Sequence, residues 1–66
     1  MNRTAERLME EAVELEAAFR AGQLRGHEKE AVIRLDRKTR ALELVTGRKY
    51  DELAREISRK AEEKHG

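Results

Sequence analysis

The apolar positions of the first twenty residues follow the repeat of an amphipathic helix. They recur at spacings of 4, 3, 4, 3 and 4 residues, as in a helix that buries one stripe. Its members are Met1, Ala5, Leu8, Ala12, Leu15 and Phe19. Asn2 or Thr4 can cap the start, and Gly22 with Gly26 is typical of a helix end followed by a tight turn. The pattern predicts a helix over about residues 3 to 21, after which the chain reverses direction.

Residues 27 to 46 carry two stripes on roughly opposite sides of one predicted helix. The first consists of Val32, Leu35, Thr39 and Leu42, with Ala31 and Val45 at its margin. The second, which we call the Ile33–Leu44 stripe, consists of Ile33, Arg37, Arg40 and Leu44. A helix with two such sides requires two packing partners. Thr46 and Gly47 then end it.

A third helix is predicted over about residues 49 to 63, where the chain shows a single narrow apolar stripe. The stripe consists of Tyr50, Leu53, Ala54, Ile57 and Ala61. Residues 64 to 66 are expected to fray. Together the patterns predict an all-α fold over residues 1 to 66: an antiparallel helical hairpin with the third helix packed on the second.

An alternative interpretation makes residues 31 to 36, AVIRLD, a short strand. Residues 46 to 63, TGRKYDELAREISRKAEE, resemble the second helix of ribbon-helix-helix DNA-binding proteins, which implies a strand followed by two helices. Only residues 37 to 45 separate this strand from TGR, which is short for the first helix of that family. A heptad helix also precedes the strand, whereas the strand of that family lies at the N-terminus. The three-helix interpretation is therefore preferred.

Length and composition limit how the chain can be stabilised. It has 66 residues, no Cys and no Pro, and Leu, Ile, Val and Phe make up only 13 positions. Disulfides and thiolate metal sites are excluded, and a chain this short buries only a thin core. Burial of the Ile33–Leu44 stripe in a homo-oligomer, most simply a dimer, would add stability. No apolar run approaches a membrane span or a signal peptide, so we expect a soluble cytoplasmic protein without a membrane partner.

Charge is distributed unevenly although the total is only +1. Residues 1 to 19 carry a net charge of −3, residues 20 to 49 of +5 and residues 50 to 66 of −1. One explanation is internal complementarity, in which acids of the first helix lie near Arg34 and Lys38. These acids are Glu10, Glu11 and Glu14.

Catalytic chemistry has no visible constellation in this sequence. His27 and Glu28 begin like the zinc motif HExxH, but Ala31 stands where the second histidine ligand is needed. Gly22 and Gly26 are not followed by the Lys-Ser/Thr pair of a phosphate-binding loop. We therefore expect no enzyme, no cofactor and no metal site.

The chain is predicted to be a non-catalytic helical interaction protein, such as a regulator, inhibitor or adaptor, that also self-associates. The contact residues are expected to be Ile33, Arg37, Arg40 and Leu44, because arginine stems cover apolar surface while the guanidinium binds carboxylates or phosphates. The alternative is a small DNA- or RNA-binding regulator. Its phosphate contacts would come from Arg34, Lys38, Arg48 and Lys49. The sequence does not identify the partner.

Overall fold

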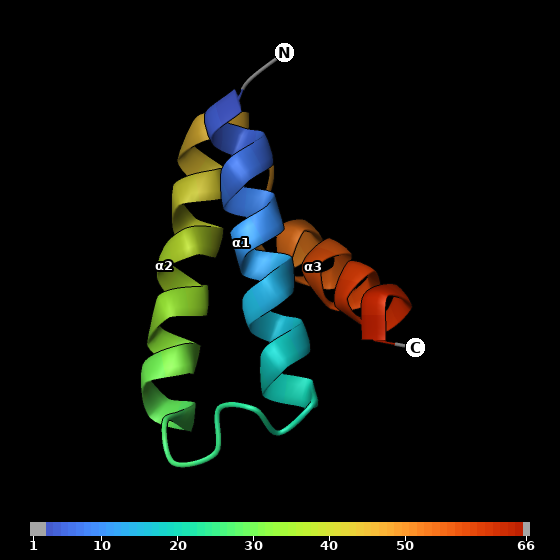
Figure 1. The fold of residues 1–66 in the computed structure, drawn as a ribbon. Helices are drawn as coiled ribbons and strands as arrows, with labels where there is room; N and C mark the ends of the chain where they lie inside the picture. The colour runs from blue at the N-terminus through green and yellow to red at the C-terminus, as the bar shows by residue number, and fades with distance from the viewer. Residues whose placement is uncertain (1–2, 66) are drawn as a thin grey trace.

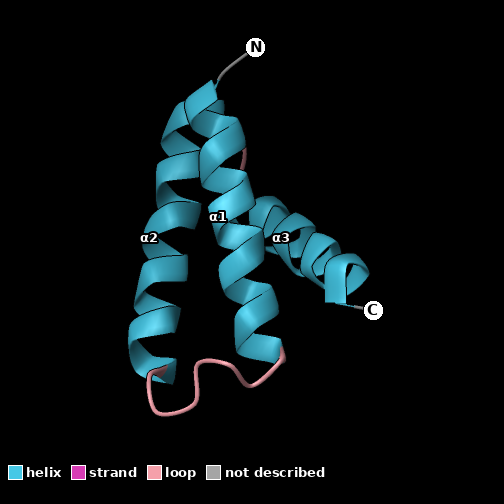
Figure 2. Ribbon diagram, viewed as in Figure 1, coloured by secondary structure: helices cyan, strands magenta, loops and turns pink. Residues whose placement is uncertain are grey.

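Three helices form the fold in the computed structural model, which describes residues 3–65, with side chains for residues 3–64. They are α1 (Arg3–Arg20), α2 (Glu28–Thr46) and α3 (Tyr50–His65). No strand occurs within the described part of the chain (Figures 1 and 2). The all-helical prediction is confirmed.

The alternative with a strand at residues 31 to 36 is wrong, because this segment lies inside α2. α3 continues to His65, past the predicted end at residue 63. The predicted roles of Met1, Asn2 and Gly66 lie outside the described residues.

A short loop joins α1 and α2 into the predicted antiparallel hairpin (Figure 1). Gly22 adopts a φ of 75°, the left-handed conformation that ends many helices. Its N–H donates to the carbonyl of Phe19 at 3.1 Å, and the next N–H, of Gln23, donates to the carbonyl of Ala18 at 3.0 Å. This pair of bonds is a Schellman motif, so the loop satisfies the last carbonyls of α1 while it reverses the chain.

Gly47 ends α2 in the same left-handed conformation, with a φ of 73°. Its N–H donates to the carbonyl of Glu43 at 2.9 Å. α3 begins three residues later, with Asp51 and Glu52 in its first turn, where negative charge favours the helix dipole. The turn between α2 and α3 is therefore fixed by backbone and side-chain chemistry near Gly47.

The hydrophobic core is small and receives side chains from all three helices. α1 contributes Ala12 and Val13, α2 contributes Leu42, and α3 contributes Leu53, Ile57 and Ala61. Its largest buried side chains are Leu42, Leu53 and Ile57, each at most 2% exposed. This confirms the narrow stripe predicted for α3 and the thin core expected from the chain length.

α3 packs on α2, as predicted, but it packs more extensively on α1, which the prediction did not include. The reason is a second apolar stripe on α1, formed by Met9, Val13 and Ala17 at spacings of four residues. Arg20, at the end of α1, also donates a hydrogen bond to the hydroxyl of Ser58 in α3. α3 therefore crosses α1 and leaves much of α2 uncovered (Figure 1).

Three apolar side chains that were expected at the core lie largely outside it. Val32 and Val45 of α2 and Phe19 of α1 are all exposed. Val32 and Phe19 line a small pocket between α1 and α2 near the hairpin loop, and Val45 lies in the last turn of α2.

Candidate interaction surface on the second helix

The Ile33–Leu44 stripe lies on the side of α2 that faces away from the core. Ala31, Thr39 and Leu42 point inward and are buried, whereas Ile33 is 45% exposed and Leu44 is 88% exposed. At about 100° per residue the two sets lie on opposite sides of the helix. Neither α1 nor α3 covers this face, so its apolar residues have no packing partner within the described chain.

Exposed apolar side chains are concentrated on α2. Five large apolar side chains are exposed among the described residues, and four of them belong to this helix. They form two adjacent pairs, Val32 with Ile33 and Leu44 with Val45, one near each end of α2. A single exposed Leu or Val is ordinary on a protein surface, but Ile33 and Leu44 share one face of this helix.

Arg40 is held at one edge of the stripe by a three-residue cluster. Its Nε donates to Oδ2 of Asp36 at 2.9 Å, and the hydroxyl of Tyr50 donates to Oδ1 of the same carboxylate at 2.6 Å. The guanidinium carbon of Arg40 lies 5.9 Å from the centre of the Tyr50 ring. The cluster therefore fixes a guanidinium on the open face and ties the start of α3 to α2.

The same contacts perturb the pKa values of this cluster. The hydrogen bond from Tyr50, followed by the one from Arg40, lowers the pKa of the Asp36 carboxyl. The hydrogen bond to Asp36 and partial burial raise the pKa of the Tyr50 hydroxyl. Asp36 is therefore ionised and Tyr50 is protonated at neutral pH, and the cluster keeps its charges.

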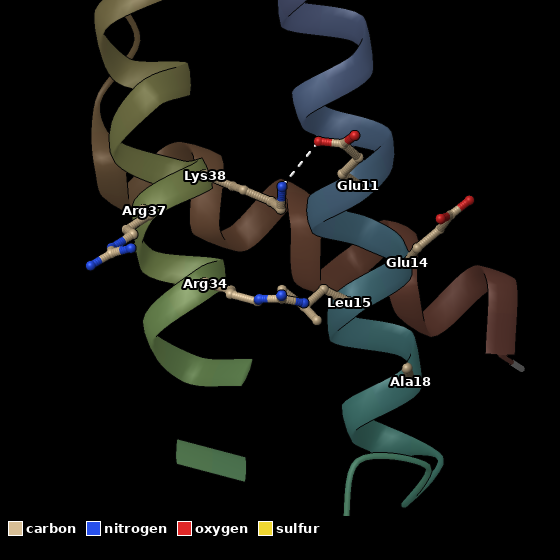
Figure 3. Close-up of a pocket in the computed structure, with 7 residues that line it drawn as sticks. All are labelled: Glu11, Glu14, Leu15, Ala18, Arg34, Arg37 and Lys38. Atoms are coloured by element: carbon tan, nitrogen blue, oxygen red, sulfur yellow. Dashed lines mark hydrogen bonds and ion pairs between the residues drawn. The ribbon is translucent and has the colours of Figure 1, made fainter. Parts of the chain in front are cut away.

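Arg37 belongs to the stripe, and in Figure 3 its guanidinium points away from the other side chains drawn. It makes no ion pair or hydrogen bond with any described side chain. Arg34, one turn earlier, extends across the groove between α2 and α1 towards Leu15 (Figure 3). Lys38 crosses the same groove and binds Oε1 of Glu11 at 3.0 Å. The predicted charge complementarity between the first two helices is thus confirmed for one pair.

Glu14, another acid expected to face α2, contacts α3 instead. Its Oε1 lies 3.7 Å from Nζ of Lys64. Glu14 also lines the groove that Arg34 and Lys38 enter, but in Figure 3 its carboxylate points away from both. The acidic side chains of α1 therefore pair with both neighbouring helices: Glu11 with Lys38 of α2, and Glu14 with Lys64 of α3.

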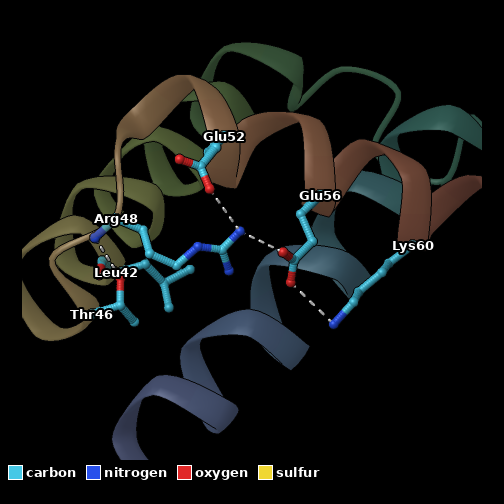
Figure 4. A network of polar contacts seen from close by, with 6 residues as sticks. All are labelled: Leu42, Thr46, Arg48, Glu52, Glu56 and Lys60. Atoms are coloured by element: carbon cyan, nitrogen blue, oxygen red, sulfur yellow. Dashed lines mark hydrogen bonds and ion pairs between the residues drawn. The ribbon is translucent and has the colours of Figure 1, made fainter.

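Arg48 belongs to a separate network at the turn between α2 and α3 (Figure 4). Its Nη2 lies 2.7 Å from Oε1 of Glu56 and 3.4 Å from Oε1 of Glu52, and Lys60 binds the second oxygen of Glu56 at 3.3 Å. The backbone N–H of Arg48 also donates to the hydroxyl of Thr46 at 3.2 Å. Arg48 therefore joins the end of α2 to the first two turns of α3.

This network shifts the pKa values of its members in opposite directions. The hydrogen bond from Arg48 is the largest cause that lowers the pKa of Glu56, although partial burial opposes it. The hydrogen bond to Glu56 likewise raises the pKa of Arg48. Both groups are charged at neutral pH, and each stabilises the charge of the other.

The structure brings the four predicted contact residues together on one face of α2, but it distributes the four predicted phosphate contacts over two places. Arg34 and Lys38 line the groove between α1 and α2, whereas Arg48 lies at the α2–α3 turn. Lys49, which is exposed, follows Arg48 in that turn. The role of these residues towards nucleic acid stays a prediction.

Sequence reasoning missed two features of the structure. The bond between Asp36 and Tyr50 joins residues 14 positions apart, and no local pattern indicates it. The stripe of Met9, Val13 and Ala17 had a visible signal in its four-residue spacing, but the heptad pattern of the same helix obscured it.

Comparison of the chain with protein-family models, with characterised proteins and with solved structures finds no match. Within the described residues, no helix is long and apolar enough to cross a bilayer. In the same part of the chain, no three His, Cys, Asp or Glu side chains gather as a metal site would require. The function has to be inferred from the residues themselves.

Proposed function

We propose that this protein is a small non-catalytic interaction protein that self-associates through the open face of α2. The observation that carries the proposal is the exposure of Leu44, 88%, on the same face as Ile33 and opposite the core. Removal of apolar surface from water is the main favourable contribution in protein association. Ile33 and Leu44 lie towards the two ends of one face of α2, so a partner helix packed along this face would cover both.

The size of the core gives this contact a further role. Three large side chains buried among the described residues, Leu42, Leu53 and Ile57, are few for a domain that must order more than sixty residues. Small domains commonly supplement such a core by oligomerisation. Association through α2 would therefore stabilise the fold as well as create a functional surface.

A protein partner is favoured over nucleic acid by the way the cations are used. Lys38 and Arg48 are both in ion pairs with acids of the same chain, so phosphate contacts would have to compete with these bonds. Ile33 and Leu44 have no role in phosphate binding. Arg34 and Arg37, which make no ion pair among the described residues, are the observation that supports nucleic acid as a second candidate.

The test of self-association is the solution mass, measured by light scattering over a dilution series for the wild type and for Leu44→Glu. Gln23→Glu is the matched control, because it adds the same charge in the exposed α1–α2 loop. We expect a dimer for the wild type and the control at high micromolar concentration, and a monomer of unchanged helicity for Leu44→Glu. A monomeric wild type, or a Leu44→Glu variant that keeps the dimer mass, would refute the proposal.

The nucleic-acid candidate is tested by titration against duplex and single-stranded DNA and RNA at several salt concentrations. Phosphate contacts give an affinity that falls steeply with salt. Binding of this kind, reduced in an Arg34→Gln variant, would favour the second candidate. Absence of binding at low salt would remove it.

A further inference from the structure

The Ile33–Leu44 stripe is symmetric about its own centre. Its four members are spaced 4, 3 and 4 residues apart, so the order apolar, Arg, Arg, apolar is the same from either end. Ile33 and Leu44, both exposed, lie at equal distances from the peptide bond between Lys38 and Thr39. In a twofold contact residue i meets residue j and j meets i, so this symmetry lets each apolar end of the stripe meet the apolar end of a copy.

We propose that the occupant of this face is a second copy of the chain, with the two α2 helices antiparallel about a twofold axis at Lys38 and Thr39. In this register Ile33 packs against the partner's Leu44, and the reverse contact repeats on the other side of the axis. The inference rests on the proposed function and adds the orientation and register of the contact.

The Asp36–Arg40 pair provides charge complementarity that favours the antiparallel arrangement. Both residues lie along one edge of the stripe and are bonded at 2.9 Å. In the antiparallel register the partner's Arg40 is level with Arg37, one residue from Asp36. Each Asp36 carboxylate is therefore near a guanidinium of the other chain. A parallel twofold partner would place this edge of the two helices on opposite sides of the contact, so Asp36 and Arg40 could not bond across it.

The hydrogen-bonding capacity of these groups leaves room for such cross-contacts. Asp36 accepts one bond on each oxygen, from Arg40 and from Tyr50, and an ionised carboxylate can accept about four. Arg40 uses only its Nε in the bond to Asp36, so both terminal nitrogens remain available to the partner's carboxylate. With its side chain 70% exposed, Arg40 can reach across an interface.

Arg37 limits the affinity of this contact. It carries a charge without an ion pair in the described chain, and the antiparallel register brings it level with the partner's Arg40. One helix pair also buries much less than the roughly 1,600 Å² of a standard protein interface. We therefore expect a dimer with a Kd on the order of micromolar or weaker. Because a twofold contact is closed, assembly stops at two copies.

The register can be tested with two single-cysteine variants, Ile33→Cys and Leu44→Cys, because the chain has no cysteine of its own. Each variant is treated with a short bifunctional thiol cross-linker, alone and after mixing with the other at equal concentration. Identical positions of an antiparallel dimer are offset by about 16 Å along the helices, whereas Ile33→Cys and Leu44→Cys are adjacent. Gln23→Cys, in the exposed loop, is the control for random collision.

We expect cross-linked dimer mainly in the mixture, at least several-fold above either variant alone, with one linked peptide from each variant. Preferential linkage of identical positions would overturn the inference in favour of a parallel dimer. A dimer mass with linkage no greater than for Gln23→Cys would also overturn it, although the proposed self-association would stand. A monomer mass throughout would instead refute the proposed function.

Discussion

Replacement of Arg37 by Leu should tighten the dimer. Arg37 lies at the middle of the Ile33–Leu44 stripe, is exposed, and has no ion pair in the described chain whose loss would cost stability. Arg37→Leu completes an apolar stripe between Ile33 and Leu44 and removes a charge that faces the partner's Arg40. Removal of this like-charge repulsion and burial of a leucine side chain both favour association.

The magnitude follows from the area that a helix-pair contact can cover. Full burial of a leucine side chain is worth about 1.5–3 kcal/mol, and an interface position of this kind reaches roughly half of that. Two copies each contribute one substitution, so the dimer gains about 2 kcal/mol. Since about 1.4 kcal/mol corresponds to tenfold in Kd, we expect a decrease in Kd of roughly 30-fold.

Sedimentation equilibrium over a wide concentration range measures this change directly. Arg55→Leu, at an exposed position of α3, is the control for non-specific association. The reasoning fails if Arg37→Leu leaves Kd unchanged or raises it, or if Arg55→Leu tightens association by the same factor. Arg37→Leu also separates the two functional candidates, because it should weaken any binding to nucleic acid.

Three further predictions concern the fold that carries this surface. Leu53→Ala should lower the free energy of unfolding, measured by urea titration, by about 2–5 kcal/mol, because Leu53 is fully buried between the helices. Val32→Ala, at an exposed site, is the control and should lower it much less. Arg48 lowers the pKa of Glu56 in the folded chain, so this pair stabilises the fold above the ordinary carboxyl pKa, and that contribution is lost as the pH falls through the lowered value. Thermal unfolding across the acid range should therefore depend less on pH in Glu56→Gln, and an unchanged pH dependence would contradict the assigned role of the pair. Gly47→Ala should lower the free energy of unfolding by about 1 kcal/mol, because the φ of 73° is strained for any residue with a Cβ. The added methyl group would meet no non-neighbouring atom within 4 Å, so the whole loss would come from backbone strain. An unchanged thermal midpoint would contradict this.

The sequence was sufficient to predict the three helices and their ends because local chemistry determines them. Gly22 and Gly47 supply the left-handed residues at which α1 and α2 end, and both helices end within a residue or two of the expected positions. The segment AVIRLD, which is compatible with a strand in isolation, forms helix because it lies within nineteen consecutive helical residues that contain no glycine or proline.

The placement of α3 could not be predicted from periodicity, because two stripes competed for it. The stripe on α1 is wholly apolar, whereas the Ile33–Leu44 stripe has two arginines at its centre, whose burial against α3 would be costly. α3 therefore packs against Met9, Val13 and Ala17, and the arginine-bearing face of α2 stays open. The predicted contact residues are exposed for the same reason that α3 packs more on α1 than on α2.

The contact between the two copies can be measured by an isotope-filtered NOE experiment on a mixture of labelled and unlabelled protein, which reports only contacts between chains. Within one chain, Ile33 and Leu44 are about 16 Å apart along α2, too far for an NOE. We predict NOEs between the methyl groups of Ile33 and Leu44 across the two chains at concentrations where the dimer forms. Dimeric protein without these NOEs, or monomeric protein with both methyl groups fully accessible to a paramagnetic probe in solution, would contradict the account.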